Sequence, residues 1–278
     1  MLKGTIVKNI SNKYTVMCQD KLYDCTPRGK FRFEKKVPLV GDYCMIDEEN
    51  CYIIEILERK NELQRPNVSN VDVALIVTSM KQPDFNATLL DKEISSVILE
   101  SIEPVICFTK IDLLSEEEIK QYQELRAYYQ RIGIYCFDNT ELNELKSYLK
   151  EKYVVLTGQT GAGKSTLLNK LAPTLNLKTN EISFALNRGK HTTRHTEIFT
   201  IDGIHFFDTP GFSSLELENK TKEEIRDSFI DFQEYHCKFQ DCMHLKENVC
   251  GVKEAREQGK ILDSRYSSYQ RMIDEVTR

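Results

Sequence analysis

The hydrophobic pattern of the first 62 residues is that of short strands separated by polar turns. Segments 4–10, 13–18 and 21–25 are rich in β-branched and aromatic residues, and Ser-Asn and Gln-Asp pairs separate them. Segments 40–46 and 51–58 continue the pattern on either side of the acidic turn DEEN. Short strands at this density, over about 60 residues, predict a small N-terminal β-barrel of the OB type.

A different rhythm begins near residue 63, where strand-like and helix-like segments alternate. Ser115 and Glu118 form a capping-box pair at the start of one predicted helix. This alternation predicts an α/β unit with a mostly parallel sheet. Its expected strands are 73–79, 104–110, 134–137 and 153–158, its expected helices are 87–99, 116–131 and 163–171, and a hairpin around Asp202-Gly203 joins 197–201 to 204–208.

The last part of the chain is polar and helical. Helices are expected over 222–234 and 264–276, with a Cys- and His-rich segment between them. We therefore divide the chain into a barrel at 1–62, an α/β domain at 63–218 and a helical domain at 219–278. The predicted fold is multidomain α/β.

Composition and charge narrow the class of protein. The chain has 278 residues, of which 40% are hydrophobic and 29% are charged, as in a globular protein. No apolar run approaches the length of a membrane span, and the N-terminus lacks the apolar core of a signal peptide, so we expect a cytoplasmic protein that does not bind membranes. Nine cysteines in such a chain favour free thiols and a metal site over a disulfide framework.

The net charge of −5 excludes a uniformly basic nucleic-acid binder but allows a local basic patch. Residues 27–36, PRGKFRFEKK, place two phenylalanines among basic side chains. Such a loop could contact RNA phosphates and stack a ring on a base, or it could be an ordinary solvated loop.

A phosphate-binding motif follows the expected strand that ends near residue 157. Gly158–Ser165 reads GQTGAGKS, which fits GxxxxGKS between a strand and a helix. In this motif backbone N–H groups surround the phosphates, the lysine reaches the β- and γ-phosphates, and the Ser hydroxyl binds Mg²⁺. The expected nucleotide-binding residues are Gly158, Gln159, Thr160, Gly161, Ala162, Gly163, Lys164, Ser165 and Thr166.

Two further motifs fit a guanine nucleotide. Asp208-Thr209-Pro210-Gly211 ends a strand, and it places a carboxylate on the magnesium side and the Gly211 N–H towards the γ-phosphate. Thr109, Lys110 and Asp112 form the TKID motif at the end of another strand. The Asp112 carboxylate can accept both N–H groups on the guanine edge, and the Lys110 stem can pack along the base.

The spacing of Cys237, Cys242, His244 and Cys250 is C-x4-C-x-H-x5-C. Three thiolates and one imidazole in so short a segment suit a structural Zn²⁺ with no open coordination position, one ion per chain. The other cysteines lie mostly in strand patterns, and we interpret them as core residues.

The order of the motifs along the chain is TKID, P-loop, then DTPG, and it resembles that of circularly permuted GTPases. With the strand-rich N-terminus and the Cys/His segment, the whole chain is similar to the ribosome small-subunit-dependent GTPase family. Arg65-Pro66-Asn67, RGKHTT at 188–193 and DTPGF at 208–212 support this resemblance. It implies a monomeric GTPase that acts in late maturation of the small ribosomal subunit, binds the subunit and its rRNA, and hydrolyses GTP to GDP and phosphate with stimulation by the subunit.

The polar, basic loop at 188–195, between the P-loop helix and DTPG, suits a mobile switch and carries the expected catalytic groups besides Lys164. Thr193 is our preferred second magnesium ligand, with Thr192 as the alternative. Phe212 occupies the place where Ras-like enzymes carry a water-orienting Gln, so intrinsic hydrolysis should be slow. The resemblance implies that a histidine such as His191 supplies the missing polar contact once a partner rearranges the switch.

Some points stay open at the level of sequence. His195 is an alternative to His191, and residues 137–140 lack the usual Ser-Ala of the guanine loop. A P-loop enzyme acting on a small molecule is one rival function. A zinc-containing RNA-binding protein whose nucleotide site is mainly structural is the other.

Overall fold

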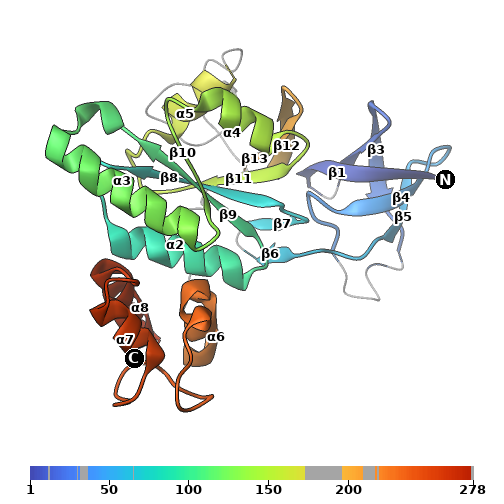
Figure 1. Cartoon of the computed structure of the whole chain (residues 1–278). Coiled ribbons are helices and arrows are strands. Elements are labelled where there is room, and N and C mark those ends of the chain that lie inside the picture. Colours follow the sequence, from blue (N-terminus) through green and yellow to red (C-terminus); the bar gives the residue numbers. More distant parts are fainter. Residues whose placement is uncertain are drawn as a thin grey trace.

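The computed structural model describes residues 1–11, 13–29, 31, 37–64, 66–172, 196–208, 217 and 219–276 (Figure 1). Its N-terminal part confirms the expected barrel. Strand β1 closes it by pairing with β2 on one side and with β4 on the other. Gly4 permits this closure, because a Cβ there would lie 2.3 Å from Cys18 Sγ. The five strands are β1 (Leu2–Ile10), β2 (Lys13–Cys18), β3 (Lys21–Pro27), β4 (Tyr43–Asp47) and β5 (Tyr52–Ile56).

A short hairpin that the sequence pattern did not predict follows the barrel. Strands β6 (Glu62–Gln64) and β7 (Asn67–Ser69) pair with each other in a separate two-stranded sheet. The buried carboxylate of Asp42 fixes this connection. It accepts bonds from Arg59 Nε at 2.7 Å and from Ser69 Oγ at 2.6 Å. The passage from the barrel to the α/β part is therefore held by a buried polar network.

The α/β part has the expected strand–helix alternation. Strands β10, β9, β8, β11 and β13 run parallel in that order, and β12 joins β13 as an antiparallel hairpin. The strands are β8 (Val73–Ser79), β9 (Glu103–Thr109), β10 (Tyr135–Asp138), β11 (Tyr153–Thr157), β12 (Thr196–Ile201) and β13 (Ile204–Asp208). The helices are α2 (Ala87–Leu99), η1 (Ile111–Leu113), α3 (Glu116–Arg131), α4 (Leu142–Leu149) and α5 (Lys164–Leu171).

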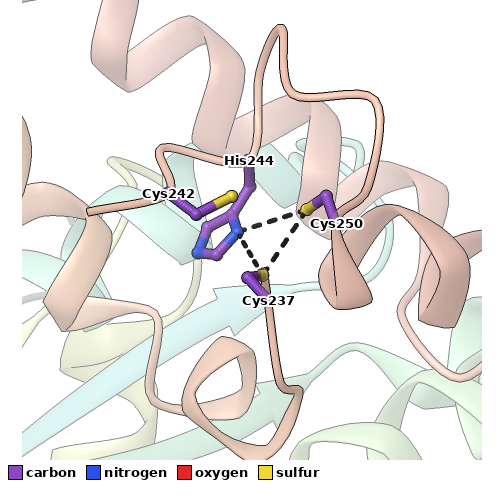
Figure 2. Close-up of side chains that lie close together, drawn as sticks. All are labelled: Cys237, Cys242, His244 and Cys250. Atoms are coloured by element: carbon purple, nitrogen blue, oxygen red, sulfur yellow. Dashed lines mark hydrogen bonds between the residues drawn. The ribbon is translucent and has the colours of Figure 1, made fainter. Parts of the chain in front are cut away.

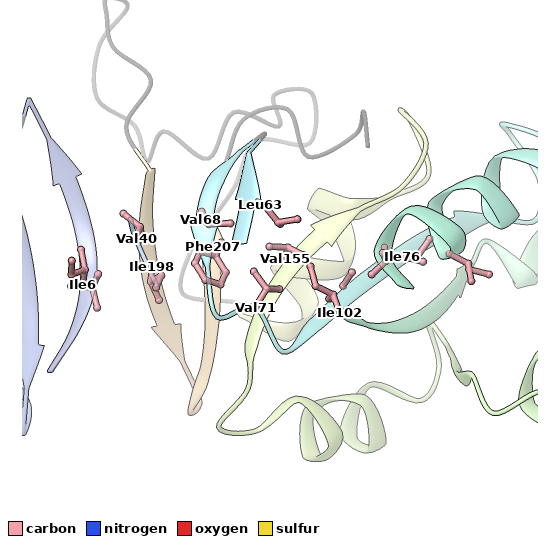
Figure 3. Close-up of a cluster of buried hydrophobic side chains, with 14 of the residues drawn as sticks. Ile6, Val40, Leu63, Val68, Val71, Ile76, Ile102, Val155, Ile198 and Phe207 are labelled. Atoms are coloured by element: carbon pink, nitrogen blue, oxygen red, sulfur yellow. The ribbon is translucent and has the colours of Figure 1, made fainter. Parts of the chain in front are cut away.

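Barrel and α/β part share one sheet. Strand β1 also pairs with β12, with Lys8 opposite Glu197 and Asn9 opposite Thr196, which gives an 11-stranded sheet. One buried apolar cluster runs from the barrel through this junction into the α/β part, as Figure 3 shows. Ile6, Ile198, Phe207 and Val155 mark its course across the sheet. The two parts are thus packed as one body at this junction, although the predicted boundary at residue 62 itself stays a prediction.

The C-terminal helical part packs against α2 (Figure 1). One expectation for it was wrong, and one helix was not predicted. The segment 222–234 is not one helix, because a turn at Phe229 separates α6 (Lys222–Ser228) from the 3₁₀ helix η3 (Ile230–Glu234). The Cys/His segment is followed by an unpredicted helix, α7 (Gly251–Glu257), before α8 (Asp263–Glu275). In the described part of the chain, no helix has the length and apolar character needed to cross a membrane.

Candidate nucleotide site and metal centre

The P-loop lies between β11 and α5, as the motif requires. Gly158, Gly161 and Gly163 have φ values of 126°, 79° and 95°. Such values favour glycine, and a Cβ at Gly158 would also lie 2.0 Å from the carbonyl oxygen of Val77. The loop can therefore turn closely against β8. Gln159 is half-buried, Ala162 is buried, and Thr160 and Thr166 are exposed.

Lys164 is folded back onto this loop. Its Nζ donates to the carbonyl oxygens of Gly158 and, at 2.9 Å, of Gln159. Burial lowers the pKa of Lys164, and the nearby carboxylate of Glu93 partly offsets that effect. Ser165 is buried beside it at the first turn of α5. The ammonium group is thus held by backbone oxygens at the place where the motif positions phosphate.

The TKID segment is in contact with the P-loop. Thr109 Oγ1 donates to the carbonyl oxygen of Ala162 at 2.6 Å, and Lys110 Nζ donates to that of Gly161 at 2.8 Å. Lys110 has a φ of 59°, and Asp112 is exposed in the short helix η1. These contacts join two motifs that are about 50 residues apart, because β8, β9 and β11 are parallel and end at the same edge.

Asp208 ends β13, next to the P-loop strand in the sheet. Its side chain is buried, and burial together with Glu197 raises its pKa to about 7. Glu197 is its register partner on β12 and also pairs with Lys8 of the barrel. A buried carboxylate with a raised pKa at this edge is suited to a cation, which would favour its ionised form.

Cys237, Cys242, His244 and Cys250 come together in the C-terminal part, as Figure 2 shows. Their ligand atoms all lie within 4.8 Å of one another. His244 Nδ1 is 3.4 Å from both Cys237 Sγ and Cys250 Sγ, and those two sulfur atoms are 3.8 Å apart. Three of the four side chains are buried and Cys237 is half-buried. A compact, closed S₃N donor set of this kind fits tetrahedral Zn²⁺.

The surrounding chain holds the four residues in place. Tyr269 Oη donates to the carbonyl oxygen of Met243 at 2.6 Å, and the Glu247 carboxylate accepts from the backbone N–H of Met243 and Leu245 at 2.9 and 2.8 Å. At Gly251, a Cβ would lie 2.3 Å from the carbonyl oxygen of His236. Burial, with the neighbouring thiols, raises the pKa of Cys242 to about 12. A metal would have to displace that proton.

Several expected residues lie outside the described residues. These are Gly211, His191, Thr193 and its alternative Thr192, together with His195, Phe212 and most of the basic loop 27–36. The sequence motifs missed one buried acidic residue near the nucleotide site. Glu93 on α2 belongs to no motif, and neither its spacing nor its charge distinguishes it in the sequence.

The TKID loop, the P-loop and Asp208 meet at one edge of a mostly parallel sheet, in a chain order that places the TKID motif first. This arrangement defines a circularly permuted P-loop GTPase fold.

Comparisons with known proteins agree with this class. The family described as RsgA GTPase matches residues 56–218, and the RsgA N-terminal domain matches residues 3–52. The chain therefore belongs to the RsgA GTPase family and is a GTP hydrolase.

Individual relatives cover nearly the whole chain. The small ribosomal subunit biogenesis GTPase RsgA 2 of Oceanobacillus iheyensis is 43% identical over 99% of this chain and 98% of its own. The RsgA of Bacillus velezensis is 44% identical, with the same coverage. The crystal structure of YjeQ from Thermotoga maritima is 34% identical, covers 99% of this chain and 98% of that chain, and has a TM-score of 0.85. YloQ, described as a circularly permuted GTPase, is 36% identical with a TM-score of 0.85, over 100% of this chain and 95% of its own.

Proposed function

We propose that this GTPase acts in late maturation of the small ribosomal subunit, where it binds the subunit and its rRNA and hydrolyses GTP to GDP and phosphate. The observation that carries the proposal is the contact of Thr109 and Lys110 with the P-loop, which joins a guanine-reading motif to a phosphate-binding one. The names of the relatives supply the subunit. We further propose a cytoplasmic monomer.

The nucleotide is held by three loops in this proposal. Asp112 accepts the N–H groups of the guanine edge, and Lys110 lies along the base. The backbone N–H groups of 158–163 surround the phosphates, and Lys164 leaves its carbonyl partners to contact the β- and γ-phosphates. Thr109 keeps the base-reading loop against the P-loop through Ala162.

Ser165 and Asp208 are the described residues that would face a magnesium ion, and Thr193 is proposed as a further ligand. Mg²⁺ bound there would neutralise charge that develops on the β- and γ-phosphate oxygens. Gly211 is proposed to donate its N–H to the γ-phosphate, and His191 to orient the attacking water when the subunit is bound. Without that partner, Phe212 offers no hydrogen bond to water, so turnover should be slow.

The C-terminal part, with its Cys/His cluster, and the barrel are proposed to contact the subunit. Cys237, Cys242, His244 and Cys250 would hold one Zn²⁺, whose chemistry here is structural. The four side chains would then hold the loop between η3 and α7 in one conformation. The basic loop at 27–36 supplies cations for RNA phosphates.

The decisive experiment is GTP hydrolysis by the purified protein with and without purified small ribosomal subunits. We expect slow turnover alone and strong stimulation by subunits. The Lys164→Ala and Ser165→Ala proteins should hydrolyse no GTP in either condition while remaining folded. Binding of the subunit without any stimulation would instead favour the zinc-containing RNA-binding protein with a mainly structural nucleotide site.

A further inference from the structure

Helix α2 carries a buried carboxylate on each of two opposite sides. Asp91 and Glu93 are two positions apart, which corresponds to about 200° around a helix. Asp91 faces the C-terminal part and α3, where it accepts from Arg265 and Tyr129. Glu93 instead faces the nucleotide site, where it hydrogen-bonds the side chain of Thr157, the last residue of β11.

Glu93 is also close enough to Lys164 for each charge to act on the other. The ammonium group of Lys164 lowers the pKa of Glu93, and the carboxylate raises that of Lys164. Only 8% of Glu93 and 6% of Lys164 is exposed, so water screens this interaction weakly. Burial has the larger effect on the carboxyl group and raises its pKa to about 7, so the ionised form predominates near pH 8.

This arrangement affects phosphate binding. In the proposed complex, Lys164 Nζ must leave the carbonyl oxygens of Gly158 and Gln159 and contact the β-phosphate instead. A buried negative charge near enough to act on the lysine competes with the phosphate for that ammonium group and also repels the phosphate itself. Neither effect involves the guanine base, which the TKID loop would contact.

The structure assigns Glu93 as a positioning residue that opposes binding of the β-phosphate through Lys164, and so limits the affinity for GDP and GTP. The inference rests on the proposed function, because it takes the P-loop as the nucleotide site. It goes beyond that function by giving a residue outside every nucleotide-binding motif a specific effect on affinity.

The test is a series of ligands with increasing numbers of phosphates. Dissociation constants for guanosine, GMP and GDP are measured near pH 8 by calorimetry on the full-length wild type and on Glu93→Gln, which keeps the size and the hydrogen-bonding capacity of the side chain. We expect Glu93→Gln to bind GDP about three- to thirty-fold more tightly, as the removal of one nearby charge would produce. Guanosine and GMP should change by less than about two-fold, since neither has a phosphate at Lys164.

Three further variants make the outcome specific. Glu93→Asp, which keeps the charge, should stay close to wild type, and Glu117→Gln, an exposed carboxylate on α3, should have no effect. Lys164→Ala should lose GDP binding. If it binds GDP normally, the proposed nucleotide site is wrong. Suppose instead that Lys164→Ala loses GDP binding, but Glu93→Gln binds GDP as wild type does or changes the affinities for guanosine and GDP equally. The proposed role of Glu93 is then refuted, while the nucleotide site stands.

Discussion

Arg265 and Asp91 form a buried ion pair between residues that are 174 positions apart in the chain. The guanidinium Nη1 lies 2.7 Å from Asp91 Oδ1, and neither side chain is exposed. Arg265 also pairs with Asp231 at 2.9 Å, and Tyr128 and Tyr129 donate to the two carboxylates at 2.7 Å each. This cluster attaches the C-terminal part to the helices of the GTPase domain.

Substitution of Arg265 by Met should destabilise the protein by about 3–5 kcal/mol, because two buried carboxylates lose their counter-charge. Urea unfolding measures this loss. The matched control is Lys92→Met, which breaks the half-exposed Lys92–Glu275 pair between the same two helices and should lose less than about 1 kcal/mol. Equal losses in the two variants would contradict the structural importance of the buried cluster.

The acidic residues of α2 also illustrate what the sequence can and cannot predict. The helix itself was predicted at 87–99 and is found there, because its apolar positions and the Asn86 cap are local signals. That Asp91 and Glu93 are buried depends on partners far away in the chain. No periodicity in the sequence reveals that Arg265 will lie on the Asp91 side of this helix and Lys164 on the opposite, Glu93 side.

The same distinction applies elsewhere. The P-loop and the Cys/His cluster were predictable, since phosphate and metal binding require several particular residues within one short segment. Helix α4 was not predicted although Leu142, Leu145 and Leu149 recur at helical spacing, so its local pattern was available in the sequence. Its short length and the lack of a side-chain cap at Glu141 leave it without a clear starting signal. The pairing of β1 with β12 was missed because alternation identifies a strand but not its neighbour.

The raised pKa of Glu93 predicts a pH dependence of stability. Its pKa is about 7 in the folded protein and ordinarily 4.5, so between these values the folded state binds the proton more tightly. Stability from this group is greatest at low pH and is lost as the pH rises to about 7. Glu93→Gln should therefore gain on wild type between pH 5 and pH 8, by on the order of 1–3 kcal/mol.

Unfolding of both nucleotide-free proteins across this pH range measures the difference. Glu117→Gln serves as the control, since its side chain is exposed and should follow the wild-type profile. A constant gap between wild type and Glu93→Gln would show that the buried carboxyl group does not titrate in this range.

Metal analysis should find one zinc ion per chain. Cys242→Ser should lose it and unfold the C-terminal part, because metal binding and local folding are linked in such small units. Hydrogen exchange resolves this loss from the rest of the chain. Cys51→Ser, in the barrel and outside the cluster, should retain zinc. If the wild-type protein without zinc protects residues 235–257 from exchange as well as the protein with zinc does, the proposed metal centre is wrong.

Base recognition can be tested at Asp112. Replacement by Asn exchanges a hydrogen-bond acceptor for a donor, so the variant should prefer xanthosine diphosphate over guanosine diphosphate. Competition binding with the two nucleotides measures the preference. Asp20→Asn, in an exposed turn of the barrel, is the control. Unchanged preference for GDP in the Asp112 variant would mean that another segment reads the base.

The nucleotide state should influence binding to the subunit. Asp208 ends β13, the last strand in chain order among the described residues, and α6 of the C-terminal part begins at Lys222. The DTPG motif therefore lies in the short stretch of sequence between the GTPase sheet and the C-terminal part. A non-hydrolysable GTP analogue should tighten binding to purified subunits relative to GDP by a factor of about 5–150. Equal affinities in the two states would exclude such coupling even in an active GTPase.

The strand that the barrel shares with the GTPase sheet has a consequence for dividing the chain. Because β1 covers the outer side of β12, a GTPase fragment without the barrel would present an unpaired strand edge and would tend to associate with other strands. Conversely, a chain cut between β6 and β7 should yield two halves that find each other again through β1 and β12. The barrel thus supplies the strand that covers the edge of the GTPase sheet. A split reporter divided at the turn between β6 and β7 would measure how the two halves reassemble.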